Sequence, residues 1–84
     1  MKVWITKYAL TRGILQADGE ADGSMFEVTD SRHPGALKIY YHGDEWHIKR
    51  AAAVKRAEEM RRKKIASLRR QITRLEALIF EEEP

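Results

Sequence analysis

The chain contains no cysteine and only two prolines among its 84 residues. Without cysteine it has neither disulfide bonds nor thiolate metal ligands. Cysteine usage therefore does not indicate whether its compartment is oxidising or reducing. No apolar run approaches the roughly 20 residues of a membrane-spanning helix, and the N-terminus lacks a secretory signal pattern. We therefore expect a cytoplasmic protein with one small domain, a size at which self-association often supplements a limited core.

The residue patterns of enzymes are also missing. The serines have no patterned histidine or aspartate companions, and the chain has neither a phosphate-binding loop nor a dinucleotide fingerprint. His42 and His47 flank Asp44 and Glu45, but they fall on a turn between expected strands and lack the helical spacing of a zinc signature. The sequence thus predicts a non-enzymatic protein with no metal and no cofactor.

Residues 1–47 show the pattern of short strands separated by turns. Val3 and Ile5 alternate with polar and aromatic residues, which is typical of a strand with one buried face. Asp18-Gly19 and Asp22-Gly23 are turn dipeptides, and 30–35 is a loop rich in turn residues. Strands are predicted over 2–10, 14–17, 25–29 and 36–42, and 45–47 is either a brief fifth strand or the lead-in to the helix. These strands predict an antiparallel β-sheet or a small SH3-like barrel.

A long amphipathic helix is predicted over 48–80, followed by an acidic tail at 81–84. Alanines are frequent at its start, and no glycine or proline occurs between Ile48 and Pro84. Apolar residues then recur at spacings of 3, 4, 3 and 4, as the a and d positions of a heptad: Ile65, Leu68, Ile72, Leu75 and Ile79. The fold class is therefore α+β, and a helix this long must project from the sheet, fold back near 58–64 or pair with another chain.

The charge is unevenly distributed. Residues 1–47 have a net charge of −2, whereas residues 48–84 have a net charge of +5. Three basic pairs repeat at seven-residue intervals beside the apolar stripe, at heptad positions e and f. With two further cations they form the basic ridge: Lys55, Arg56, Arg61, Arg62, Lys63, Lys64, Arg69 and Arg70. The ridge favours an acidic partner, either nucleic acid or a protein surface; the alternative is a solvated helix face.

The apolar stripe also has two interpretations. It either packs on the sheet of its own chain or pairs with a second copy, and we favour a dimer because 47 residues hardly cover the whole helix. In a parallel dimer Lys64 would face the partner's Arg69, so an antiparallel arrangement is preferred. A basic-region leucine zipper is not favoured, because two heptads are short and the base-reading asparagine pattern is absent.

Aromatic residues suggest a second binding element. Most must belong to the core of so small a domain, but alternation leaves one or two partly exposed. Exposed aromatics beside Arg or Lys suit base stacking or a protein hot spot. The candidates for an aromatic patch are Trp4, Tyr8, Tyr40 and Trp46.

The segments Trp4–Ile14, Tyr41–His47 and Lys63–Leu68 together resemble small uncharacterised accessory proteins encoded by phages and prophages. The resemblance implies a bacterial host cell and a role in binding, and it brings no site residues. Its leading implication is an inhibitor that docks on a host nucleoprotein defence complex, in the manner of an anti-CRISPR protein. A direct nucleic-acid-binding accessory protein and a structural oligomerisation module remain the alternatives.

Overall fold

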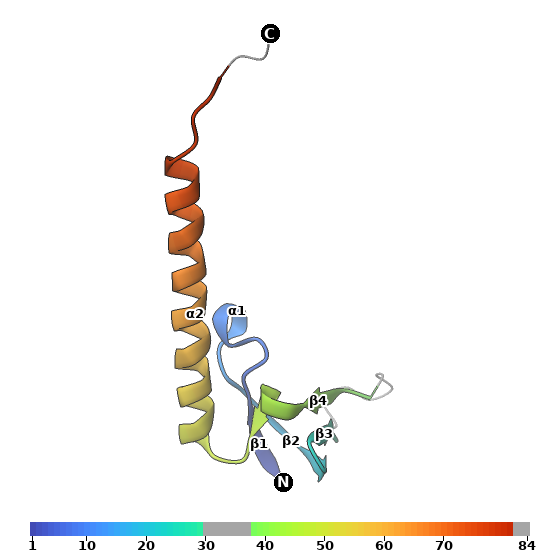
Figure 1. Ribbon diagram of the computed structural model, residues 1–84. Coiled ribbons are helices and arrows are strands. Elements are labelled where there is room, and N and C mark those ends of the chain that lie inside the picture. Colours follow the sequence, from blue (N-terminus) through green and yellow to red (C-terminus); the bar gives the residue numbers. More distant parts are fainter. Residues whose placement is uncertain (30–37, 82–84) are drawn as a thin grey trace.

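The computed structural model describes residues 1–29 and 38–81, and it confirms an α+β protein with an N-terminal antiparallel sheet and a long C-terminal helix (Figure 1). Along the chain the elements are β1 (Lys2–Ile5), α1 (Ala9–Arg12), β2 (Leu15–Asp22), β3 (Met25–Val28), β4 (Tyr40–His42), the 3-10 turn η1 (Gly43–Glu45), β5 (Trp46–His47) and α2 (Arg50–Glu76). No described helix is long and apolar enough to cross a membrane.

The five strands form one curled antiparallel sheet, a half-barrel, in the order β4-β3-β2-β1-β5. β1 pairs with a strand on each side: Ile5 lies opposite Leu15 of β2 and opposite Trp46 of β5. The turn η1 connects the two edge strands, and Gly43 at its start has a φ of 56°. This connection brings β5 back to β1 and places the start of α2 beside the sheet.

The inner face of the half-barrel holds the core. Val3, Ile5, Phe26 and Tyr41 are buried there, and burial raises the pKa of the Tyr41 hydroxyl. The Trp46 ring lies 5.3 Å from that of Phe26, and its indole N–H donates a hydrogen bond to the Ser24 carbonyl. The alternation that placed Val3 and Ile5 on one face is therefore confirmed.

Two predictions about the strands are wrong. The strand expected over 2–10 ends at Ile5, and the chain turns into the short helix α1. Thr6 still donates its backbone N–H to the Glu45 carbonyl, and its buried hydroxyl meets the Asp44 carbonyl and His47, before the chain turns at Lys7. Asp18-Gly19 is not a turn, because β2 runs through it to Asp22.

The hairpin between β2 and β3 turns at Gly23, which has a φ of 61°, so the second turn dipeptide was the correct one. Gly19 is needed for a different reason, since a side chain there would meet the backbone of Glu27 on β3. Of the strand expected over 36–42, the described part is extended only at Tyr40–His42. The loop expected at 30–35 lies outside the described residues.

The helix α2 is continuous over 27 residues, without a break near 58–64. It ends at Glu76 rather than at residue 80, and the Ala77 amide caps it by donating to the Thr73 carbonyl. One cause favours this end: the acids that follow would be unfavourable at the C-terminus of a longer helix, where the helix dipole is negative. The molecule is correspondingly elongated, at 62 × 30 × 21 Å.

One face of α2, near its N-terminus, packs against the sheet. Ala53 is fully buried, and Ala57 and Met60 are half-buried on the same side of the helix. α2 contacts α1, β1 and β5, so it covers the outer side of β1, opposite the core. Figure 1 shows the other half of α2 projecting beyond these elements.

The N-terminus of α2 is poorly capped, and this can be tested. Lys49 has the extended backbone of an N-cap residue, but its side chain makes no capping bond, and Arg50 follows it. We expect Lys49→Asp to raise the free energy of unfolding by about 1 kcal/mol, because a carboxylate accepts hydrogen bonds from the first amides and suits the helix dipole. Urea denaturation measures this change. Lys49→Ala is the control, and an equal gain from alanine would contradict the capping explanation.

Candidate functional site

Five cations of the basic ridge lie together on α2. Lys55, Arg62 and Arg69 occupy successive e positions, while Lys63 and Arg70 occupy f positions, and all five are exposed. Because the helix is continuous, the seven-residue spacing keeps them on one side over about 22 Å. We call these five residues the outer basic face.

The three e positions of the outer basic face point away from the sheet. Each residue advances about 100° around an α-helix, so the e positions lie about 180° from Ala53 and Ala57, which pack on the sheet. Within the described part of the chain, no ion pair reaches any of the five cations. The surface is thus open to solvent, and no acid among the described residues forms an ion pair with it.

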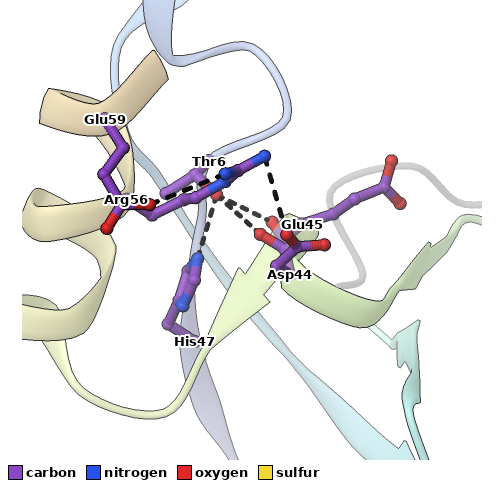
Figure 2. A network of polar contacts seen from close by, with 6 residues as sticks. All are labelled: Thr6, Asp44, Glu45, His47, Arg56 and Glu59. Atoms are coloured by element: carbon purple, nitrogen blue, oxygen red, sulfur yellow. Dashed lines mark hydrogen bonds and ion pairs between the residues drawn. The ribbon is translucent and has the colours of Figure 1, made fainter. Parts of the chain in front are cut away.

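Arg56 belongs to the same repeat but has a structural role. Its guanidinium lies 3.6 Å from the Asp44 carboxylate of η1 and 3.7 Å from Glu59, one turn along α2. Its side chain is only 30% exposed. Figure 2 shows Arg56 reaching from α2 toward the turn that carries Asp44, beside Thr6. This contact fixes the helix to the sheet rather than presenting a charge to a partner.

Thr6 is the centre of the same polar cluster. Its hydroxyl lies 3.0 Å from His47 Nε2 and 3.2 Å from the Asp44 carbonyl oxygen (Figure 2). The Glu45 carboxylate accepts the His42 amide at 2.8 Å, which closes η1. The cluster thus joins the end of β1, the turn and β5, the elements on which α2 rests. Sequence reasoning missed it, because its members are far apart in the chain.

The other two members of the ridge lie off the outer basic face. Arg61 occupies a d position and pairs with Glu58 at 3.4 Å. Lys64 occupies a g position, on the side of α2 nearer the sheet, and is exposed. Of the eight predicted residues, five are therefore brought together as one surface. Arg56 and Arg61 are engaged in ion pairs.

The structure does not gather the predicted aromatic residues into one patch. Trp46 is half-buried against the core, whereas Trp4 lies on the opposite face of the sheet. Tyr8 is exposed beside α1, where Lys7 and Arg12 lie over its ring at 5.7 and 5.9 Å. Tyr40 is exposed on β4, at the far side of the sheet.

The surroundings of Tyr40 are acidic. It lines a hollow of about 430 Å³ with Glu20, Asp22 and Glu27, and Glu20 is directly opposite Glu27 in the β2–β3 pairing. Lys38 lies 3.3 Å from Glu27, and this hydrogen-bonded carboxylate raises the pKa of the lysine. These acids form a negative patch at the β2–β3–β4 side of the sheet, away from the strands that α2 contacts.

The described residues include no group of three or more potential metal ligands. His47 Nε2 lies within hydrogen-bond distance of the Thr6 hydroxyl. Comparison with known proteins gives no match: no family model, curated protein or solved structure is similar to this chain.

Proposed function

We propose that this protein binds nucleic acid through the outer basic face of α2. The observation that carries the proposal is the placement of five cations on the exposed side of a projecting helix, without an intramolecular ion pair among the described residues. Phosphates are attracted to such a surface because binding releases the counterions condensed on the nucleic acid. The e and f positions contain only Lys and Arg along this face, so we expect phosphate contacts and little base readout.

A protein target, including a host defence complex, is less well supported by this geometry. Protein hot spots centre on aromatic or Arg anchors in desolvated pockets. Here Trp4 and Trp46 are half-buried in the fold, and Tyr40 lies in the acidic part of the sheet. None of the four candidate aromatic residues belongs to α2, and the arginines of the outer basic face are exposed rather than set in a desolvated pocket. An electrostatic partner therefore fits better than a hot-spot partner.

The proposal predicts a strong and specific salt dependence. The logarithm of the affinity for fluorescent duplex DNA or RNA should fall linearly with the logarithm of the salt concentration. The slope should be about −0.9 for each phosphate neutralised. Arg62→Ala with Lys63→Ala, and separately Arg69→Ala with Arg70→Ala, should each make the slope less steep by up to about 2. Titrations followed by fluorescence anisotropy measure both effects.

Lys2→Ala is the matched control, since Lys2 is an exposed cation on the sheet, opposite Asp18. It should leave the slope unchanged. Absence of binding at about 50 mM salt, where electrostatic attraction is strong, would refute direct nucleic-acid binding. A protein captured in its place, with one or two dominant positions and salt acting mainly on the association rate, would indicate the hot-spot partner.

A further inference from the structure

The free half of α2 carries an uncovered apolar stripe, which we call the seam. Its four residues, Ile65, Leu68, Ile72 and Leu75, are 41%, 43%, 53% and 66% exposed. All four lie within the helix, on the side between the face that packs on the sheet and the outer basic face. An aligned row of exposed Ile and Leu at a and d positions is typical of a helix that pairs with another helix.

We propose that the seam joins two copies of this chain as an antiparallel dimer, and that the dimer merges both outer basic faces into one binding strip. The role of the strip rests on the proposed function. The dimer rests on the seam alone, so the two are tested separately.

The spacing of the seam fits an antiparallel two-fold axis. Its intervals are 3, 4 and 3 residues, and they read the same in either direction. An axis beside residue 70 therefore matches every seam residue with one of the partner. Ile65 meets the partner's Leu75, and Leu68 meets the partner's Ile72. Each of the four layers thus holds one a and one d residue.

The charges beside the seam favour the same arrangement. In an antiparallel pair the e positions of the two helices lie beside each other, so Arg62 comes next to the partner's Glu76. Two such attractive pairs form, one at each end of the seam. In a parallel pair the g and e positions meet instead, and Lys64 would lie beside the partner's Arg69. The antiparallel pair thus has two attractive contacts and one repulsive contact, at Arg69, whereas the parallel pair has two repulsive contacts, so the charges favour an antiparallel second copy.

The sheet leaves room for this partner. The shared layers span 64–76, whereas the main contacts of α2 with the sheet are at Ala53, Ala57 and Met60. These contacts occupy c and g positions, so each sheet lies on the g side of the seam. The e side stays open in both copies.

Both outer basic faces then lie on the open e side of the dimer. They follow one another from Lys55 to the partner's Lys55, a distance of about 45 Å along the helices. That length corresponds to about 13 base pairs of duplex. A parallel dimer would instead place the two faces on opposite sides of the pair, where one straight duplex does not reach both.

The centre of the strip links dimerisation to binding. Arg69 and the partner's Arg69 meet beside the two-fold axis, where their like charges weaken the free dimer. A phosphate backbone lying on the strip removes this repulsion. Nucleic acid should therefore tighten the dimer, and the dimer should bind nucleic acid more tightly by the same factor.

A charge exchange tests the antiparallel register without nucleic acid. Arg62→Glu should raise the dimer dissociation constant roughly five- to tenfold, since attraction at two exposed pairs becomes repulsion. Arg62→Glu with Glu76→Arg should restore it, because the exchanged charges again attract. Analytical ultracentrifugation measures the constants.

Lys63→Glu with Glu76→Arg is the matched control. Its dimer dissociation constant should stay above that of the wild type, because position 63 lies one residue away from the interface row and does not meet residue 76 of the partner. Failure of the Arg62 and Glu76 exchange to rescue association would overturn the proposed register. In a parallel dimer these two positions do not meet.

A distance measurement tests the orientation directly, because the chain has no native cysteine. A single spin label at Ala52→Cys should give an inter-label distance of about 55 Å by pulsed electron resonance in the antiparallel dimer. A parallel dimer places the labels about 20 Å apart, at the separation of neighbouring helices plus the two labels. The short distance, or no dipolar coupling under dimer conditions, would contradict the proposal.

Duplex length then tests the strip. Duplexes of about 14 base pairs should bind the dimer at least tenfold more tightly than duplexes of about 8 base pairs, with little further gain at about 20. Equal affinity for the two shorter duplexes would overturn the strip. No binding to any duplex, with the charge-exchange rescue intact, would refute the proposed function and leave the antiparallel dimer supported.

Discussion

Gly19→Ala is expected to remove most of the free energy of unfolding. A Cβ at this position overlaps the Glu27 carbonyl oxygen and lies 2.9 Å from the Phe26 ring. Neither neighbour can yield easily, because Glu27 belongs to the β3 backbone and Phe26 is fully buried. Separating β2 from β3 should cost about 3 kcal/mol or more. That is most of the roughly 5 kcal/mol expected for so short a chain.

Far-ultraviolet circular dichroism and tryptophan fluorescence, followed against urea, measure this loss. Gly23→Ala in the same hairpin is the control. Its Cβ would meet no atom within 4 Å, and the strain comes only from a φ of 61°, so the cost should be about 1 kcal/mol. If both variants lost equal stability, the close approach of β3 to Gly19 would not be the cause.

Leu68→Glu with Ile72→Glu is expected to convert the proposed dimer to a monomer while the sheet stays folded. The two changes place four carboxylates in the two central layers of the seam, where they would be buried without partners. We expect the dimer dissociation constant to rise at least 100-fold, which corresponds to about 3 kcal/mol. Light scattering and sedimentation measure it, and thermal unfolding of the sheet should change little because both side chains are already exposed.

Ile79→Glu is the control for the added negative charge. Ile79 was predicted to extend the stripe, but it lies beyond the end of α2 and is 83% exposed. Its substitution should therefore alter association far less than the double change at the seam. A wild-type protein that stays monomeric at high concentration would show that the seam is not an interface.

The features that could be predicted from sequence depend on residues close together in the chain. Seven-residue repetition of basic pairs identified a face of a helix, and the absence of glycine and proline between Ile48 and Pro84 indicated that the helix is long. Alternation at Val3 and Ile5 identified the core face of β1. Each of these patterns is local, and its physical meaning follows from the geometry of one element.

The errors arose where a distant contact decides the local structure. Gly19 looked like a turn glycine, but its lack of a side chain serves the approach of β3. Thr6 fits the strand pattern of the sequence, but its hydroxyl lies beside Asp44 and His47, at the end of β1. Arg56 matched the basic repeat, and only the position of η1 shows that it pairs with Asp44. No periodicity in the sequence reports these pairings.

Because α2 is attached near its N-terminus, a small tilt there moves its C-terminal half by a larger distance. The helix is about 40 Å long, and it is held near its base by the Ala53 contact and by the ion pair between Arg56 and Asp44. The part of α2 beyond Arg56 is about 30 Å long, so a tilt of about 10° at that contact would move the tip by about 5 Å, more than one base-pair step. Small rearrangements of η1 are therefore magnified at Arg69 and Arg70, which do not touch that turn. The positions of Arg69 and Arg70 therefore depend on how rigidly the N-terminal part of α2 is held against the sheet and η1.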